Sequence, residues 1–262
     1  MSLAKPVALT IAGSDPSGGA GIQADLKTFH QFGVYGEAVL TLITVQNTCG
    51  VQRVESLAPD LVSDQIRAVI GDIPPGAAKT GALGNRGIIE AVAALASGFS
   101  FPLIVDPVMV SKHGAALLAP DAVGALKTRL LPLAFLLTPN LHEAELLTGG
   151  EVRDVAGMRR AAQTLAAFGP KAVLVKGGHL AGDSTDVLFY QDGWQEFTSP
   201  RIATRNTHGT GCTLSAAITA SIARGYELPE AVERAKRYIT EAIRSNPGLG
   251  AGSGPLDHHA LL

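Results

Sequence analysis

Short apolar runs alternate with helix-like segments along almost the whole chain, and this alternation limits the possible folds more than any other feature. Strands are predicted at residues 7–12, 38–45, 77–83, 103–105, 135–137 and 172–176, with a hairpin at 186–190 and 194–198 joined by a turn that contains Gly. Helices are predicted at 21–32, 60–72, 88–96, 121–131, 155–165, 211–224 and 230–244. This alternation favours an α/β fold with a mostly parallel sheet and helices on both faces.

The length and composition fit one α/β domain. Domains of roughly 250 residues are common in this class, and the chain has 262 residues, 46% of them hydrophobic. A charged fraction of 17% excludes intrinsic disorder, which needs low hydrophobicity and high charge. We therefore expect a single domain over 1–262 with a core at about 6–245. The Gly-rich stretch 248–254 predicts a flexible C-terminal tail, and 108–118 predicts a lid-like loop.

Charge and cysteine content argue against several functional classes. The formal net charge of −2 leaves no basic excess to follow a phosphate backbone, so we expect no nucleic-acid partner. No stretch of about 18 apolar residues occurs, so we expect no membrane span. The first residues lack the apolar core of a signal peptide, and the two cysteines form no zinc-binding CxxC pair. These features favour a cytoplasmic protein with free thiols.

The polar or Gly-rich ends of the predicted strands indicate where a ligand would bind. In parallel sheets the ligand lies beyond the carboxyl ends of the strands. The segments expected at this edge are 13–21, 46–48, 79–81, Asp106, 140–143, 176–179 and 206–212. We therefore expect these segments to converge on one site.

A Gly-rich turn at 206–211 leads directly into a predicted helix. The first N–H groups of a helix lack partners within the helix, so this turn could bind an anion such as a transferring phosphoryl group. Cys212 lies in the first helical turn, where the pKa of a thiol is typically lowered, and it could serve as a base. The alternative is a tightly packed helix start with a buried cysteine.

Two carboxylates follow predicted strands. Asp106 ends the strand at 103–105, and Glu143 lies in the sequence Thr138-Pro139-Asn140-Leu141-His142-Glu143. Magnesium in nucleotide enzymes needs only one or two carboxylates, together with waters and phosphates, so this pair suits it. The alternative is that both carboxylates cap helices or turns.

Three other features help to define the expected ligands. The segment 12–25 resembles a dinucleotide-binding loop, but the acidic residue expected about 20 residues later is missing, because that strand ends at Gln46. The segment is better suited to close contact with a small flat ligand, with Asp25 facing it. The Gln46 carboxamide matches an aminopyrimidine edge, and Lys176 could reach a phosphate. The chain has no Walker loop.

Together these segments resemble the hydroxymethylpyrimidine/phosphomethylpyrimidine kinases of thiamine biosynthesis, in the ribokinase-like superfamily. The resemblance covers roughly residues 6–245. The motifs that carry it are AGSDPSGGAGIQADLKTF (12–29), TVQNTCGV (44–51), AAKTGAL (77–83), VDPVMVSKHG (105–114), TPNLHEAELLTG (138–149), VLVKGGH (173–179) and NTHGTGCTLSAA (206–217). The Cys of GTGC separates this family from the sugar kinases, which carry Asp there, and pyridoxal kinases are related in chemistry.

The resemblance implies a single-domain, ribokinase-like three-layer α/β sandwich that uses MgATP. Such an enzyme phosphorylates the hydroxymethyl group of an aminopyrimidine and then converts the monophosphate to the pyrophosphate. The resemblance also implies a homodimer. The residues implied are, for catalysis, Cys212, Gly209, Thr210 and Gly211; for the pyrimidine, Gln46, Gly13, Asp25, Ala20, Val45, Ala82 and Val108; for the nucleotide, Lys176, Asn140 and Thr207; and for magnesium, Asp106 and Glu143.

Two positions depart from the family pattern. Ala82 stands where the family often has a Met against the pyrimidine, which predicts a looser pocket wall. His142 stands where Pro is usual, which affects the stiffness of the loop more than its chemistry.

Three other functions remain open from the sequence. They are a pyridoxal/pyridoxine kinase of vitamin B6 salvage, a Cys–His hydrolase that uses Cys212 and His208, and a non-catalytic pyrimidine-sensing protein. For the kinase we expect in-line transfer in which Cys212 accepts the alcohol proton and a lid around Lys112 excludes water.

Overall fold

A nine-stranded sheet forms the centre of the computed structural model, which describes residues 5–112, 114–178, 180 and 182–261. The strand order is β3-β2-β1-β4-β5-β6-β7-β8-β9; the six strands from β2 to β7 in this order are parallel, and β3, β8 and β9 pair antiparallel at the two sides. The strands are β1 (Val7–Ser14), β2 (Tyr35–Asn47), β3 (Gly50–Ser56), β4 (Ala77–Thr80), β5 (Leu103–Val105), β6 (Leu136–Leu137), β7 (Ala172–Val175), β8 (Ser184–Tyr190) and β9 (Gly193–Ser199).

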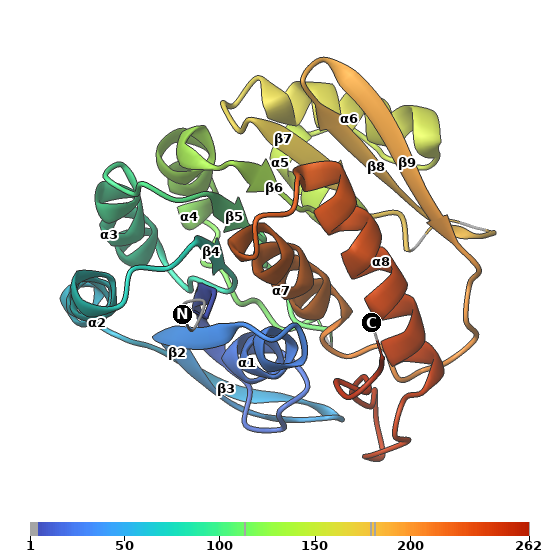
Figure 1. Cartoon of the computed structure of the whole chain (residues 1–262), viewed down its shortest axis with the longest axis horizontal. Coiled ribbons are helices and arrows are strands. Elements are labelled where there is room, and N and C mark those ends of the chain that lie inside the picture. Colours follow the sequence, from blue (N-terminus) through green and yellow to red (C-terminus); the bar gives the residue numbers. More distant parts are fainter. Residues whose placement is uncertain (1–4, 113, 179, 181, 262) are drawn as a thin grey trace.

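Helices cover both faces of this sheet (Figure 1). On one face α1, α7 and α8 pack together, and on the other α2, α3, α4, α5 and α6 lie side by side. The helices are α1 (Gly21–Gln31), α2 (Pro59–Asp72), α3 (Arg86–Ala96), α4 (Ala122–Ala125), α5 (Leu141–Thr148), α6 (Val155–Ala166), α7 (Thr210–Ala223) and α8 (Leu228–Arg244), and α4 continues as a π-helical turn (Leu126–Leu130) and a 3-10 turn (Leu131–Leu133). This arrangement confirms the predicted three-layer α/β sandwich.

The alternation of side chains along the strands divides the core into two apolar clusters. In β1, Leu9 and Ile11 pack toward the α2–α6 side, whereas Ala8 packs toward α1, α7 and α8. The second cluster includes Phe32 and Tyr238, whose rings meet edge to face at 5.1 Å. Because both faces are buried, the central strands are mostly apolar, which explains why their sequences show runs rather than alternation.

The structure adds two elements to those predicted and moves a turn. The strand β3 was not predicted because only its partner β2 is apolar, while β3 is largely exposed at the edge of the sheet. The helix α5 was not predicted as an element because it is short. The predicted Gly turn of the β8–β9 hairpin is formed by Gln191 and Asp192, both at positive φ, and Gly193 pairs with Tyr190 as the first residue of β9.

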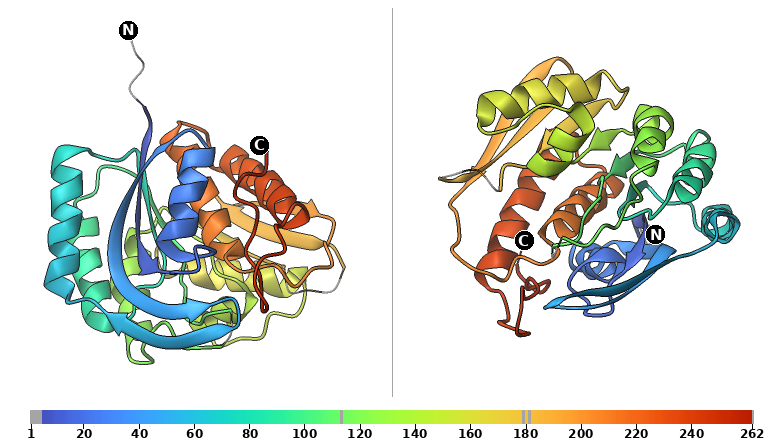
Figure 2. Two further views of the ribbon diagram at one scale, coloured as in Figure 1. Left: turned by 90° about the horizontal axis from the view of Figure 1, so that it is seen from below. Right: turned by 180° about the vertical axis from the view of Figure 1, so that it is seen from behind.

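The C-terminal segment packs against the body of the molecule. Figure 2 shows it beside the tip of the β2–β3 hairpin. Leu256, His258 and Ala260 are buried, and the amide of Asp257 donates to the carbonyl of Ala242 in α8 (3.0 Å). The flexibility predicted for the tail stays a prediction, but its last part has a defined place. No helix among the described residues is long and apolar enough to span a membrane.

Candidate active site

The carboxyl ends of the parallel strands bring the predicted segments to one edge of the sheet. At this edge α7 begins with Gly209 at its N-cap, with φ of +83°. A Cβ at Gly209 would overlap the carbonyl oxygen of Gly19, so only glycine fits this close approach between two loops. A Cβ placed on Gly211 would lie 3.3 Å from the Lys176 ammonium nitrogen and 3.9 Å from a carboxylate oxygen of Asp106. The start of α7, a cation and a carboxylate therefore meet at one point.

Asp106 is held by hydrogen bonds to both of its oxygens. Lys176 Nζ donates to Oδ1 at 2.8 Å, and Thr138 Oγ1 donates to the same oxygen at 3.2 Å. Ser215 Oγ, in α7, donates to Oδ2 at 3.2 Å. Burial alone would raise the pKa of Asp106, but Lys176 and Lys79 outweigh burial and lower it. Asp106 is therefore ionised near neutral pH, and its negative charge lies next to the N-terminus of α7.

Glu143 both caps a helix and faces the same cation. In a capping box, the Asn140 side chain accepts from the Glu143 amide (2.9 Å), and Glu143 Oε2 accepts from the Asn140 amide (2.8 Å). Burial raises the pKa of Glu143 to about 7; Lys176 opposes this rise and Asp106 adds to it. The cap expected as the alternative to a metal role is therefore present, and it leaves the carboxyl group beside Asp106 and Lys176.

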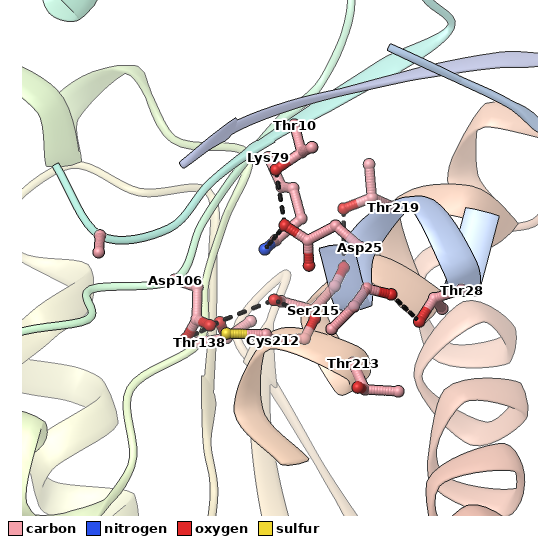
Figure 3. Close-up of polar contacts among 12 residues, drawn as sticks. Thr10, Asp25, Thr28, Lys79, Asp106, Thr138, Cys212, Thr213, Ser215 and Thr219 are labelled. Atoms are coloured by element: carbon pink, nitrogen blue, oxygen red, sulfur yellow. Dashed lines mark hydrogen bonds and ion pairs between the residues drawn. The ribbon is translucent and has the colours of Figure 1, made fainter. Parts of the chain in front are cut away.

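Cys212 lies in the first turn of α7, as predicted, but its predicted low pKa is wrong. Burial raises the pKa of the thiol to about 12; Lys79 opposes this rise, while Asp25 and Asp106 add to it. A helix start lowers the pKa of a thiol, whereas burial away from water raises it. Here two carboxylates and the loss of water outweigh the helix. Figure 3 shows the side chains of Cys212, Lys79 and Asp106 directed into one region.

Asp25 was expected to face the ligand, but its side chain is completely buried beside Lys79. Its Oδ2 accepts from Thr10 Oγ1 (2.6 Å) and from Lys79 Nζ (2.8 Å) (Figure 3). Among the residues that the structure describes, its Oδ1 has no hydrogen-bond partner. Burial raises the pKa of Asp25 even though Lys79 opposes it. Burial lowers the pKa of Lys79, but Asp25, Cys212 and Asp106 outweigh burial and raise it. Asp25 thus holds the buried Lys79 ammonium group near Cys212.

Lys79 and Asp15 lie in segments that were expected at this edge, but neither residue was predicted to have a role in the site. Lys79 had a signal, because a lysine inside the short apolar run AAKT needs a buried partner. Asp15 organises the glycine loop: its carboxylate accepts from the amides of Ser17 (2.9 Å) and Ala20 (2.8 Å) and lies 2.8 Å from His208 Nε2. The hydrogen bonds from His208, Gln46 and Ser17 outweigh burial and hold the pKa of Asp15 far below its usual value.

The remaining predicted substrate residues lie at or just after the ends of β2, β4 and β5. Gln46 hydrogen-bonds toward Asp15, and Val45 beside it is 48% exposed on β2. The Ala82 carbonyl accepts from Thr41 Oγ1 (2.6 Å), and the Val108 amide donates to the carbonyl of Asp106 (2.8 Å).

The predicted glycine, nucleotide and lid residues also lie at this edge. Gly13 forms the irregularity in β1 at the start of the loop, and the Thr207 carbonyl accepts from Thr210 Oγ1 (2.8 Å). In the predicted lid, Lys112 is exposed, while His113 lies outside the described residues, as does His179 of the Lys176 segment.

The carboxylate oxygens of Asp106 and Glu143 are the kind of ligand that magnesium prefers. Within the described part of the chain no group of three or more His, Cys, Asp or Glu side chains could hold a metal alone. Asp106 and Glu143 nevertheless offer two buried carboxyl groups beside one lysine. Magnesium bound together with nucleotide phosphates needs no more protein ligands than these.

Comparisons with known proteins agree with this geometry. The chain matches the family model described as phosphomethylpyrimidine kinase over residues 15–257. It is 51% identical over 255 residues to the hydroxymethylpyrimidine/phosphomethylpyrimidine kinase of Streptomyces coelicolor, covering 97% of this chain and 94% of that protein. The phosphomethylpyrimidine kinase structure from Clostridium difficile is similar with a TM-score of 0.81 and 47% identity, over 91% of this chain and 100% of that one. The ADP complex of Bacillus subtilis pyridoxal kinase is similar with a TM-score of 0.90 and 40% identity, over 98% of each chain.

Proposed function

The chain belongs to the phosphomethylpyrimidine kinase family, and from this we propose the substrates and the roles of its residues. It is a kinase with the ribokinase-like fold, and ATP is its phosphoryl donor. The acceptor is 4-amino-5-hydroxymethyl-2-methylpyrimidine, which becomes the monophosphate and, in a second transfer, the pyrophosphate. This assigns the protein to thiamine biosynthesis.

One observation supports phosphoryl transfer most directly, namely the meeting of Gly211, Lys176 and Asp106. The first N–H groups of a helix lack partners within the helix, so those at the start of α7 can donate to a phosphoryl group, although the Thr210 amide donates to the Thr207 carbonyl (3.4 Å). Lys176 adds a positive charge next to them. Phosphoryl transfer depends mainly on positioning and on charge stabilisation, and this arrangement supplies both. In this proposal, Gly209, Thr210 and Gly211 hold the transferring group.

Magnesium and the nucleotide phosphates bind beside the same helix start in this proposal. Asp106 and Glu143 hold the ion, directly or through water, while Lys176, Asn140 and Thr207 lie on the nucleotide side. When bound, magnesium neutralises charge on the phosphate oxygens. Asp106 is suited to this role because its pKa is lowered. A bound cation would also stabilise the ionised form of Glu143, whose pKa is raised in its absence.

The pyrimidine binds between the glycine loop and the end of β2. Gln46 offers a donor pair and an acceptor to the aminopyrimidine edge. Gly13, Ala20, Val45, Ala82 and Val108 supply the walls of the pocket, and Ala82 leaves room where the family often has Met. Asp25 does not contact the pyrimidine in this proposal; it holds Lys79 in place.

Cys212 accepts the proton of the substrate alcohol in this proposal. With a pKa of about 12 the free thiol is almost fully protonated at neutral pH, so the reactive thiolate is a minor species. The Lys79 ammonium group, which favours the thiolate, makes this species accessible.

An ADP-release assay with a panel of acceptors tests the function. The panel contains hydroxymethylpyrimidine, its monophosphate, pyridoxal and ribose, each with MgATP. Turnover of both pyrimidines well above pyridoxal is expected. Turnover of pyridoxal alone would move the protein to vitamin B6 salvage, which the similarity to the Bacillus subtilis pyridoxal kinase makes the best second candidate. Silence on all four would reject the catalytic assignment for these substrates.

We also propose one cytoplasmic kinase domain over 1–262 that forms a homodimer. The continuous sheet from β3 to β9 supports one domain, and the use of ATP supports the cytoplasmic location. The exposed Tyr35 and Ile43 on β2 support a contact between two copies. Light scattering on the purified protein measures the oligomeric state.

A further inference from the structure

The Gly-rich C-terminal segment contacts the hairpin that carries the pyrimidine-side residues. The amide of Ser253 donates to the Thr48 carbonyl at 2.8 Å, and the amide of Gly252 donates to Thr48 Oγ1 at 3.3 Å. Thr48 lies at the tip of the β2–β3 hairpin, two residues after Gln46. Side chains at Gly250 or Gly252 would overlap Thr48. The glycines are therefore needed for close contact with the hairpin.

The same segment contacts the loop that opens α7. The His208 amide donates to the Gly254 carbonyl (3.1 Å), and the Gly254 amide donates to Asn206 Oδ1 (3.2 Å). Further along, His258 Nε2 lies 3.1 Å from Oγ1 of Thr213, the residue after Cys212. One short segment therefore bonds to both sides of the proposed site.

The segment is itself anchored to α8. Tyr238 Oη, in the middle of that helix, donates to the His258 carbonyl at 3.0 Å, and both side chains are buried. Leu256 is buried in the core cluster that contains Tyr238. The segment that contacts Thr48 and Thr213 is thus itself held in place by α8 and the core.

We propose that residues 250–258 act as a strap that holds the hairpin tip and the start of α7 in register. The strap positions Gln46 against the pyrimidine and Cys212 against the alcohol, and it touches neither ligand itself. This inference rests on the proposed function. The Gly-rich stretch then has a positioning role. The end that contacts Thr48 affects binding of the pyrimidine, and the end that contacts Thr213 affects the transfer step at Cys212.

Two variants separate the two ends of the strap. Gly252→Ala places a methyl group against the Thr48 carbonyl and displaces the hairpin tip, so KM for hydroxymethylpyrimidine rises about ten- to a hundredfold while KM for ATP stays within twofold. Thr213→Val removes the hydroxyl that meets His258 and lowers kcat about tenfold at nearly constant KM. Thr213→Ser keeps the hydroxyl and restores kcat. The control is Leu249→Ala, because this side chain is 61% exposed in the same segment.

A merely structural role predicts a different pattern. If both variants lose activity only in proportion to a lower melting temperature, or if KM for pyrimidine and for ATP rise together in Gly252→Ala, the strap is not a positioning device. Wild-type values in both variants overturn the proposal as well.

Hydrogen exchange keeps this test separate from that of the proposed function. In Gly252→Ala, peptides covering 46–50 and 205–210 exchange faster than in wild type and in Leu249→Ala, whether or not the protein turns over any substrate. An inactive wild type with this exchange pattern rejects the function and keeps the strap. Unchanged exchange at both peptides rejects the strap.

Discussion

Lys79 shows how one buried charge can affect several groups of a site. Its ammonium group is fully buried, bonds to Asp25 at 2.8 Å and favours the charged forms of Cys212 and Asp106. An unpaired charge in such a place costs several kcal/mol, so the pair with Asp25 is required for the lysine to be there. Lys79 is therefore a positioning residue for the charges of the site.

Removing Lys79 alone should destabilise the protein strongly. Lys79→Met leaves the Asp25 carboxylate buried without its cation, and we expect a loss of about 3–5 kcal/mol in the free energy of unfolding, measured by urea denaturation. The double variant Lys79→Met/Asp25→Asn should recover part of this loss, because no charge is left unpaired. The control is Arg53→Met, which breaks an exposed ion pair with Glu55 and should change stability by less than about 1 kcal/mol. Equal losses of stability in Lys79→Met and Arg53→Met would contradict a special cost for the buried pair.

The high pKa of Cys212 gives its proposed role a distinctive pH dependence. A base with a pKa of about 12 is protonated at neutral pH, so its thiolate fraction, and with it kcat/KM for hydroxymethylpyrimidine, rises about tenfold per pH unit between pH 7 and 9. The measurement is kcat/KM for hydroxymethylpyrimidine over this range at a fixed MgATP concentration. A flat profile would show that no group with so high a pKa supplies the base.

The two phosphorylations should respond differently to loss of the thiol. The second acceptor is a phosphate, which is already ionised near neutral pH and needs no base. We expect Cys212→Ala to lower kcat/KM for hydroxymethylpyrimidine far more than for the monophosphate, by a factor of roughly a hundred or more. Cys49→Ala is the matched control, because this exposed cysteine lies outside the proposed catalytic residues. Equal losses for both acceptors would assign Cys212 to packing of the helix start.

At the scale of elements, the start of α5 combines a helix cap with the proposed magnesium site. The capping box between Asn140 and Glu143 fixes the carboxyl group, and the parallel bridge between Asn140 and Lys176 brings the cation to it. This double use explains why the sequence supported two interpretations of Glu143. A cap needs only local residues, whereas the neighbours Asp106 and Lys176 come from other strands.

The raised pKa of Glu143 should appear in the stability of the protein. The folded pKa of about 7 lies above the ordinary 4.5, so the folded state binds this proton more tightly and the free energy of unfolding falls as pH rises from about 4.5 to 7. Glu143→Gln keeps an oxygen for the cap and should remove part of this fall, on the order of 3 kcal/mol. Thermal melts across this range measure it. Glu37, whose pKa burial also raises to about 7, serves as the reference through Glu37→Gln.

The elements that could be predicted are those whose signals are local. Apolar runs and helical stripes identified the parallel strands and most of the helices, and the Gly-rich turn identified the start of α7. The strand β3 and the ion pair of Asp25 with Lys79 could not be predicted, because both depend on partners distant in the sequence. The low thiol pKa expected for Cys212 failed for the same reason: the helix start is local, but Asp25 and Asp106 are not.

At the scale of the whole molecule, the proposed sites for the two ligands lie at different parts of the sheet edge. Most of the proposed pyrimidine-side residues come from β1, β2 and the loops after them, with Ala82 after β4 and Val108 after β5. The proposed nucleotide-side residues Asn140 and Lys176 follow β6 and β7. The start of α7 lies between these halves, since its loop meets the glycine loop on one side and Lys176 on the other. In the proposed mechanism, α7 holds both halves in place for the transfer of the phosphoryl group.

This division predicts where each ligand protects the protein. Hydroxymethylpyrimidine alone should slow hydrogen exchange in peptides 13–21 and 44–48, whereas MgATP alone should slow it in 138–146 and 172–178. Both ligands should protect 206–213, because the helix start faces both. A bound ligand stabilises the folded state by about 2.7 kcal/mol at one hundred times its Kd, enough to slow exchange through local opening about a hundredfold. Protection of 13–21 by MgATP alone would contradict the division and would place the nucleotide at the glycine loop.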